Sequence, residues 1–245
     1  MLDLAGRHPR WGYWMVWASL KREGWRINRE RVRRLWRREG LKVPRKARKK
    51  RRWGSSENSC LRSRAEYKDH VWAWDFIHDR TATGSPWKRL SIIDEYTREC
   101  LELEAARSIK SADVIDVLTG LFRRRGVPRH IRSDNGPEFI AGEIRGRLSR
   151  SSVETLYVEP GSPWENGYAE AFGSRLRDEF LNVEEFADVR EAKALASAWQ
   201  EWYNSERPHS SLGCGTPEEF ARIKEVGRAG IEPATPGFSI PCSTD

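Results

Sequence analysis

The sequence has no apolar run long enough to form a membrane-spanning helix. A span needs about 18 consecutive apolar residues, no stretch of the chain approaches that length, and Met1–Leu4 leads into no signal-peptide pattern. Functions that depend on a spanning helix are therefore excluded. We expect a soluble, cytoplasmic protein with no membrane partner.

Paired cysteines are also missing. The four cysteines, Cys60, Cys100, Cys214 and Cys242, are scattered without any C-x-x-C spacing, which argues against a disulfide framework and against a zinc site. The sequence also shows no Ser-His-Asp or Cys-His arrangement typical of a protein nucleophile.

Acidic residues are scarce in the first part of the chain. Residues 1–53 contain 19 Lys and Arg against 4 Asp and Glu, a net charge of +15, although the whole chain of 245 residues carries only +8. The remainder is therefore net −7. This asymmetry predicts a nucleic-acid-binding arm joined to an acidic globular domain.

The basic arm has the pattern of a helix-turn-helix. Residues 12–23 are predicted to form a helix that ends at Gly24, and Asn28 is placed to cap a second helix that ends at Gly40. The second helix has an apolar face surrounded by arginines. The arginines that we expect to contact DNA are Arg29, Arg33, Arg34, Arg37 and Arg38.

Asp75 interrupts a run of apolar, strand-forming residues. Residues 71–77 read as a buried strand, with Asp75 on the same face as Val71, Ala73 and Ile77. A carboxylate in such a strand is costly to desolvate unless a positive group holds it, and a metal ion is a good partner. Asp75 is therefore a candidate metal ligand.

Asp134 has a different context. It follows a strand-like run, residues 127–133, and precedes the turn sequence Asn135-Gly136-Pro137. An acid at the carboxyl end of a strand is where open α/β sheets place ligand chemistry. Asp134 is the second candidate ligand.

Two glutamates compete for the third place. Glu165 completes a capping box with Ser162 as the N-cap of a helix, which already gives it an adequate structural role. Glu170 lies five residues later, turned by about 140° at 3.6 residues per turn, and shares a face with Ser174 and Arg177. A carboxylate beside an arginine that can bind phosphate is the better candidate for nucleic-acid chemistry.

Three motifs carry a family resemblance: Trp74-Asp75-Phe76, Ser133–Phe139 and Ser162–Tyr168. Together with the 35 residues between Asp134 and Glu170, they resemble the integrase core of bacterial insertion-sequence transposases. More narrowly, the chain is similar to the OrfB product of the large family whose core is related to retroviral integrases. The resemblance runs from about residue 7 to about residue 223.

The resemblance implies an α/β fold: a ribonuclease-H-like integrase core, with a mixed five-stranded sheet flanked by helices, and an N-terminal helix-turn-helix. Periodicity alone supports only an α/β or α+β class. The expected strands are 71–78, 88–94, 98–105, 129–133 and 153–157. The expected helices are one capped by Ser108 or Ser111 and ending near Arg125, then 137–149, the Glu170 helix and 188–204.

The resemblance also implies the site. Asp75, Asp134 and Glu170 would be the catalytic triad and hold two Mg²⁺ or Mn²⁺ ions, Asp75 bridging both. Asn135, Asn166 and Arg177 are candidates for contact with DNA phosphates. For Asp79, Glu138 and Glu179, which lie near the triad in sequence, we expect solvated or structural roles.

The implied activity is cleavage and strand transfer of a mobile element. The implied partners are double-stranded DNA, both element ends and target, and further copies of the chain, since two DNA ends must be paired. In this family the catalytic frame is usually fused by frameshifting to an upstream DNA-binding frame, so an upstream-frame protein is a further expected partner and the chain is expected to be an incomplete product. The alternative is a non-catalytic DNA-binding protein or regulator derived from a transposase.

We expect four segments along the chain. Residues 1–53 form the basic helix-turn-helix region and 54–67 a linker. Residues 68–224 form the integrase core with its C-terminal helices, and 225–245, rich in Gly, Pro, Ser and Thr, form a disordered tail.

Overall fold

The computed structural model describes residues 1–41, 43, 64–133, 142–157 and 166–228, and the chain divides into two compact units. One unit comprises Met1–Arg64 with Pro208–Cys214, and the other Ala65–Arg207 with Gly215–Asp245. Most of the predicted linker and most of the predicted tail lie outside the described residues. The segment boundaries given above therefore stay predictions.

The first unit contains the predicted helix-turn-helix. Its N-terminal helices are α1 (Leu2–Arg7), α2 (Tyr13–Arg22) and α3 (Arg29–Arg38). Asn28 caps α3 as expected, because its side chain accepts a hydrogen bond of 2.8 Å from the backbone N–H of Arg31. Gly24 follows α2 and Gly40 follows α3 in left-handed conformations that suit glycine. The two predicted helices are confirmed, and α1 was not predicted.

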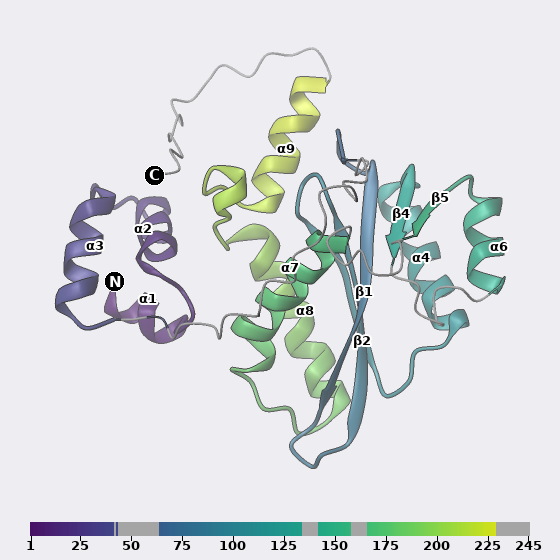
Figure 1. Cartoon of the computed structure of the whole chain (residues 1–245), viewed down its shortest axis with the longest axis horizontal. Helices are drawn as coiled ribbons and strands as arrows, with labels where there is room; N and C mark the ends of the chain where they lie inside the picture. Colours follow the sequence, from purple (N-terminus) through teal and green to yellow (C-terminus); the bar gives the residue numbers. More distant parts are fainter. Residues whose placement is uncertain (42, 44–63, 134–141, 158–165, 229–245) are drawn as a thin grey trace, which may run out of the picture. The chain divides into compact units, whose positions relative to one another are not determined.

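The second unit is built on one mixed, five-stranded sheet (Figure 1). The strands are β1 (Val71–Arg80), β2 (Pro86–Asp94), β3 (Cys100–Ala106), β4 (His130–Ser133) and β5 (Glu154–Tyr157), in the order β3-β2-β1-β4-β5. The pairs β1–β2 and β2–β3 are antiparallel, whereas β1–β4 and β4–β5 are parallel. This confirms the expected mixed sheet.

Helices cover both faces of this sheet (Figure 1). On one face lie α4 (Ser111–Arg125) and α6 (Gly142–Arg150), and on the other lie α7 (Gly167–Leu176) and α8 (Val189–Ser205). The last helix, α9 (Pro217–Arg228), packs against α8. After α7 the chain continues through a π-helical turn, Arg177–Leu181, and a short 3₁₀ helix, Ser210–Leu212, belongs to the first unit. The expected helices are present, with shifted ends.

Two hydrophobic clusters lie on opposite faces of the sheet. On one face Ala73 and Ile77 of β1 pack with Phe172 of α7 and Trp199 of α8. The other face buries Trp72, Trp74, Leu90, Ile92, Val114, Leu118, Leu121, Ile131, Ile144 and Leu148, from β1, β2, β4, α4 and α6. The alternation of β1 therefore points Asp75 toward α7, on the face of Ala73 and Ile77 that the sequence predicted.

One predicted helix cap is wrong. Neither Ser108 nor Ser111 caps α4: the N-cap is Lys110, and its backbone N–H donates a hydrogen bond of 2.7 Å to Asp113. The carboxylate of Asp113 thus satisfies the N–H of the N-cap residue, which is the bond that the third helical residue supplies in a capping box.

Candidate active site

Asp75 lies in the middle of β1 and is half-buried. It pairs with Ser91 of β2, whose hydroxyl donates a hydrogen bond of 3.1 Å to the backbone carbonyl of Asp75. This bond and the strand ladder fix the backbone from which the carboxylate projects. The predicted strand is confirmed, although the carboxylate is only half-buried.

Gly173 brings α7 close to Asp75. A Cβ placed on Gly173 would lie 3.4 Å from Cδ1 of Ile77 and 4.0 Å from Oδ2 of Asp75. Because even a Cβ at this position would be in van der Waals contact with β1, α7 lies close against the strand here. Glu170 precedes Gly173 by three residues, so it stands on the neighbouring turn of the same helix. The structure thus brings the helix that carries Glu170 against the carboxylate of Asp75.

Glu170 is on the solvent side of this contact. Glu170, Ser174 and Arg177 are all exposed, and their spacing of four and three residues places them along one side of the helix. This agrees with the predicted shared face. Arg177 begins the π-helical turn, a local widening that is frequent at functional sites.

The second candidate ligand, Asp134, is not described. β4 ends at Ser133, which is buried, and Asp134 and Asn135 lie outside the described residues, as do Ser162 and Glu165 of the predicted capping box. Within the part of the chain that the structure describes, no group of three or more His, Cys, Asp and Glu side chains could hold a metal ion. The complete triad therefore remains a prediction.

Asn166 has an unexpected environment. It is the N-cap of α7 but makes no capping hydrogen bond with its side chain. It is buried, and its Oδ1 has no hydrogen-bond partner among the described residues. The phosphate contact predicted for Asn166 stays a prediction, and burial disfavours it.

Two buried ion pairs on this face were not predicted. Arg132 of β4 donates to Glu95 at 2.7 Å, and Arg207 donates to Glu179 at 2.6 Å, with all four side chains less than 10% exposed. The pair with Arg207 gives Glu179 the structural role expected for it. Neither pair could be found from sequence spacing, because each joins residues that lie 28 or more positions apart.

The acid Asp94, at the end of β2, is buried as well. It accepts hydrogen bonds from the backbone N–H groups of Asp69 at 2.6 Å, Tyr96 at 2.7 Å and Thr97 at 2.8 Å. Burial outweighs these donors and raises the pKa of Asp94 to about 6. Its carboxylate is occupied by backbone N–H groups of its own turn and of Asp69, so its role is to hold the turn rather than to bind a ligand.

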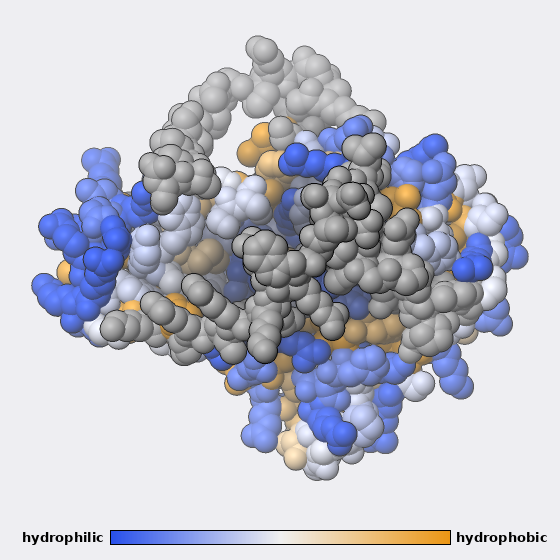
Figure 2. Space-filling view, in the orientation of Figure 1, coloured by the Kyte–Doolittle hydropathy of each residue, from blue (hydrophilic) through white to orange (hydrophobic). Residues whose placement is uncertain are grey.

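The five arginines predicted to contact DNA have different surroundings on α3. The guanidinium of Arg29 lies 4.9 Å from the Trp14 ring, Arg33 pairs with Glu30 at 3.3 Å, and Arg38 pairs with Glu39 at 3.2 Å. Arg34 and Arg37 are exposed, and so is Arg31, which the prediction left out. Figure 2 shows the strongly hydrophilic surface over α3.

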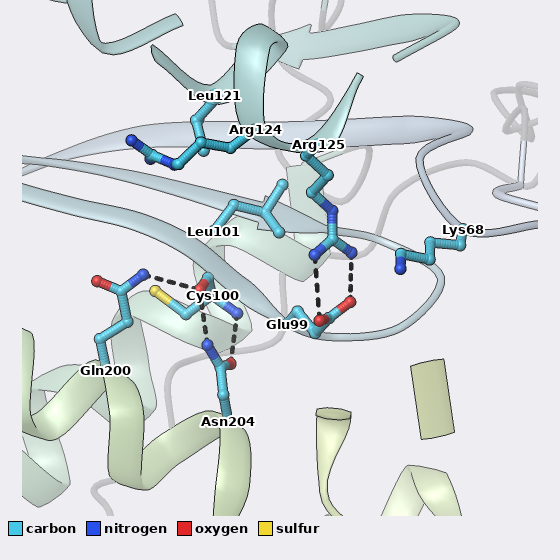
Figure 3. A pocket seen from close by; sticks show the side chains of 9 residues that line it. All are labelled: Lys68, Glu99, Cys100, Leu101, Leu121, Arg124, Arg125, Gln200 and Asn204. Atoms are coloured by element: carbon cyan, nitrogen blue, oxygen red, sulfur yellow. Dashed lines mark hydrogen bonds and ion pairs between the residues drawn. The ribbon is translucent and has the colours of Figure 1, made fainter. Parts of the chain in front are cut away.

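A pocket of about 500 Å³ lies elsewhere, at the edge of the sheet (Figure 3). Leu101 and Leu121 line it together with polar groups from α4 and α8. Gln200 and Asn204 hydrogen-bond the backbone of Cys100 at 2.8–2.9 Å, which closes part of the exposed edge of β3. Neither Asp75 nor Glu170 lines this pocket, so it is not the candidate active site.

Comparison with known proteins identifies both units. Models described as "Integrase core domain" match residues 65–163 and 151–217, and one described as "HTH-like domain" matches residues 4–51. An uncharacterized 31.7 kDa protein of insertion element IS407 from Burkholderia multivorans is 34% identical over 90% of this chain and 79% of its own length. The transposase InsD of IS2 elements from Escherichia coli is 29% identical over 89% of this chain and 75% of its own length.

A solved structure supports the same fold. The simian T-cell lymphotropic virus intasome, in complex with PP2A regulatory subunit B56 gamma, contains a chain similar to this one with a TM-score of 0.56. The match has 17% identity and covers 64% of this chain and 56% of that chain. The sheet order, the three family models and the relatives agree: the chain belongs to the insertion-element transposases, with an HTH-like domain and an integrase core.

Proposed function

We propose that the protein is a DDE transposase, a polynucleotidyl transferase that cleaves DNA at the ends of its element and joins those ends to target DNA. The observation that carries this proposal is the approach of α7 to β1 at Gly173, which places the helix of Glu170 against the carboxylate of Asp75. Two acids far apart in sequence thus come from two different elements to one region of the sheet.

The register of the parallel strands supports Asp134 as the third acid. Ala73 of β1 pairs with Arg132 of β4, and two further residues along each strand lead to Asp75 on β1 and to position 134 after β4. Residues two apart on a strand share a face. We therefore propose Asp134, the residue that follows β4, as the remaining carboxylate of the site.

The donor set fits hard divalent cations. Carboxylate oxygens are the ligands that Mg²⁺ and Mn²⁺ prefer, and the half-buried position of Asp75 beside a glycine leaves its carboxylate reachable. Asp75 would hold both ions, Asp134 one of them and Glu170 the other. Two such ions, when bound, neutralise charge on the phosphate and activate an oxygen nucleophile.

The residues of the chain then have distinct tasks. The three carboxylates would hold and orient the two cations. The exposed Arg177 would bind a phosphate of the DNA on the Glu170 side of α7. The nucleophile is water in cleavage and a DNA 3′-hydroxyl in joining. No covalent enzyme intermediate is needed, which agrees with the absence of a nucleophile motif in the sequence.

The affinity of α3 for DNA should fall measurably as the salt concentration rises. Replacing Arg34 by glutamine is expected to lower the slope of log affinity against log salt by about 0.9, because each phosphate contact releases about that many counterions. Arg33→Gln is the matched control: Arg33 is half-buried and already paired with Glu30, so a smaller change is expected. Fluorescence anisotropy over a salt series checks this, and equal slopes for wild type and Arg34→Gln would contradict the assignment.

The proposed activity is tested with labelled element-end DNA and Mn²⁺. We expect cleavage at the 3′ ends followed by joining to target DNA, resolved on a denaturing gel. DNA binding without any cleavage would instead favour the alternative, a non-catalytic DNA-binding protein derived from a transposase.

A further inference from the structure

The turn between β2 and β3, residues 94–99, is held rigidly from within. Besides the three hydrogen bonds to its carboxylate, Asp94 donates its backbone N–H to the carbonyl of Glu99 and accepts from the N–H of Arg98, both at 3.0 Å. Arg98 has a left-handed backbone, with φ of +66°, a conformation that costs a non-glycine residue energy. The hydrogen bonds of Asp94 therefore hold this turn in its strained conformation.

Side chains of the same turn reach four other elements. Glu95 pairs with Arg132 of β4, and Glu99 pairs with Arg125 of α4. Tyr96 packs against Phe220 of α9, with ring centroids 5.6 Å apart. Arg98 reaches α7. A turn of six residues thus links β4, α4, α7 and α9 of the integrase core.

The contact with α7 is close. The guanidinium carbon of Arg98 lies 3.6 Å from the centre of the Tyr168 ring, well inside the range of a cation–π interaction. Nη1 of Arg98 is buried and has no hydrogen-bond partner in the described part of the chain. Among the contacts described, the Tyr168 ring is thus what fixes this guanidinium in place.

Tyr168 belongs to the first turn of α7, two residues before Glu170. This turn lacks a side-chain cap, because Asn166 makes no capping hydrogen bond, so its position depends on tertiary contacts. The buried Ala169 supplies one such contact and the ring of Tyr168 supplies another. A helix end held in this way moves when its contacts are removed.

We propose that Arg98 is a positioning residue for Glu170: through Tyr168 it holds the first turn of α7 at the place from which Glu170 can share a divalent cation with Asp75. The inference rests on the proposed function, since it assigns Glu170 to a metal. It adds a residue outside the proposed triad. Its sequence signal is weak, because an arginine in a hairpin turn reads as solvent-exposed.

The test uses Arg98→Gly in the full chain. Glycine removes the guanidinium but suits the left-handed backbone better than arginine, so folding is preserved. We expect Mn²⁺ to bind about tenfold more weakly, as is common when a residue that orients a ligand is lost. Electron paramagnetic resonance of free Mn²⁺ measures this without DNA. Amides of the first turn of α7 are expected to exchange faster with solvent, whereas those of α8 stay unchanged.

Two variants sharpen the result. Arg98→Lys keeps a cation over the ring and should restore Mn²⁺ affinity toward the wild-type value, and Tyr168→Leu, which removes the ring, should reproduce Arg98→Gly. If Arg98→Gly binds Mn²⁺ as tightly as wild type and its α7 amides exchange at the wild-type rate, the inference is overturned, whereas the proposed function is unaffected. A lowered melting temperature with faster exchange throughout the core would also overturn the inference, because Arg98 would then be merely structural. If Glu170→Gln binds Mn²⁺ like wild type, the proposed function fails, and this inference with it.

Discussion

Replacing Asp75 by asparagine is expected to reduce DNA joining about 1000-fold or more while leaving the fold intact. Asparagine keeps the shape of the side chain but removes its charge, and Asp75 is the carboxylate that we propose to be shared by both cations. Losing such a ligand removes several kcal/mol of transition-state stabilisation, and each 1.36 kcal/mol is a factor of ten in rate. The melting temperature should not fall, because a half-buried charge is being removed.

Asp79→Asn is the matched control for this substitution. Asp79 lies on the same strand, four residues further along and on the same face, and it is also half-buried. It is not part of the proposed triad, so joining should stay within a few-fold of wild type. Single-turnover joining with saturating Mn²⁺, together with thermal melts, checks both variants. Similar losses in the two variants would show that charge on this face matters generally and would contradict a specific role for Asp75.

Replacing Arg89 by methionine is expected to stabilise the protein by about 1–4 kcal/mol, the range seen when buried ionic groups are replaced by apolar side chains. Arg89 of β2 is 0% exposed, and none of its three guanidinium nitrogens has a hydrogen-bond partner among the described residues. Its guanidinium lies between the rings of Trp87, at 4.6 Å, and Phe180, at 4.9 Å. Two cation–π contacts offset only part of the cost of burying an unpaired charge.

The lowered pKa of Arg89 has the same cause, which is the cost of burying its charge. Burial lowers the pKa to about 10, so above about pH 10 there is a range in which the folded protein binds fewer protons than the unfolded chain. Stability is recovered only as pH rises through that window, and the full penalty is present at neutral pH. Methionine removes the charge and fills the space with a flexible apolar chain.

Thermal and denaturant unfolding measure the effect. For a chain of this size, 1 kcal/mol shifts the melting temperature by about 2–4 °C, so Arg89→Met should melt several degrees higher than wild type. Arg124→Met is the control: the Arg124 side chain is 64% exposed and pairs with Glu102 on the surface, so a change within about 0.5 kcal/mol is expected. A lower melting temperature for Arg89→Met would contradict this account of the buried cation.

The sequence predicted those features that depend on local chemistry. Asn28 caps α3 because its side chain reaches a backbone N–H three residues later, and the face of Asp75 follows from strand alternation alone. Both need only a few neighbouring residues. For the same reason α1 was missed: six residues with no capping side chain carry little local signal.

Features that depend on distant residues could not be predicted. Two adjacent cations, Lys88 and Arg89, are typical of a solvent-exposed strand. Only the folded structure shows that Arg89 is buried beneath the π-helical turn that follows α7. Gly173 looks like a weak point of a helix, and only the folded structure shows that α7 lies close to Ile77 and Asp75 of β1 at this residue. The links made by the β2–β3 turn likewise appear only when four elements converge on it.

The competition between Glu165 and Glu170 tests the central claim most directly. The rate at which labelled element-end DNA is joined to target DNA in Mn²⁺ should be measured for wild type, Glu170→Gln and Glu165→Gln. The proposed triad predicts that Glu170→Gln binds DNA but does not join it, whereas Glu165→Gln, which changes an acid outside the proposed triad, keeps its activity. Joining that survives in Glu170→Gln would contradict the assignment of Glu170, and with it the proposed active site.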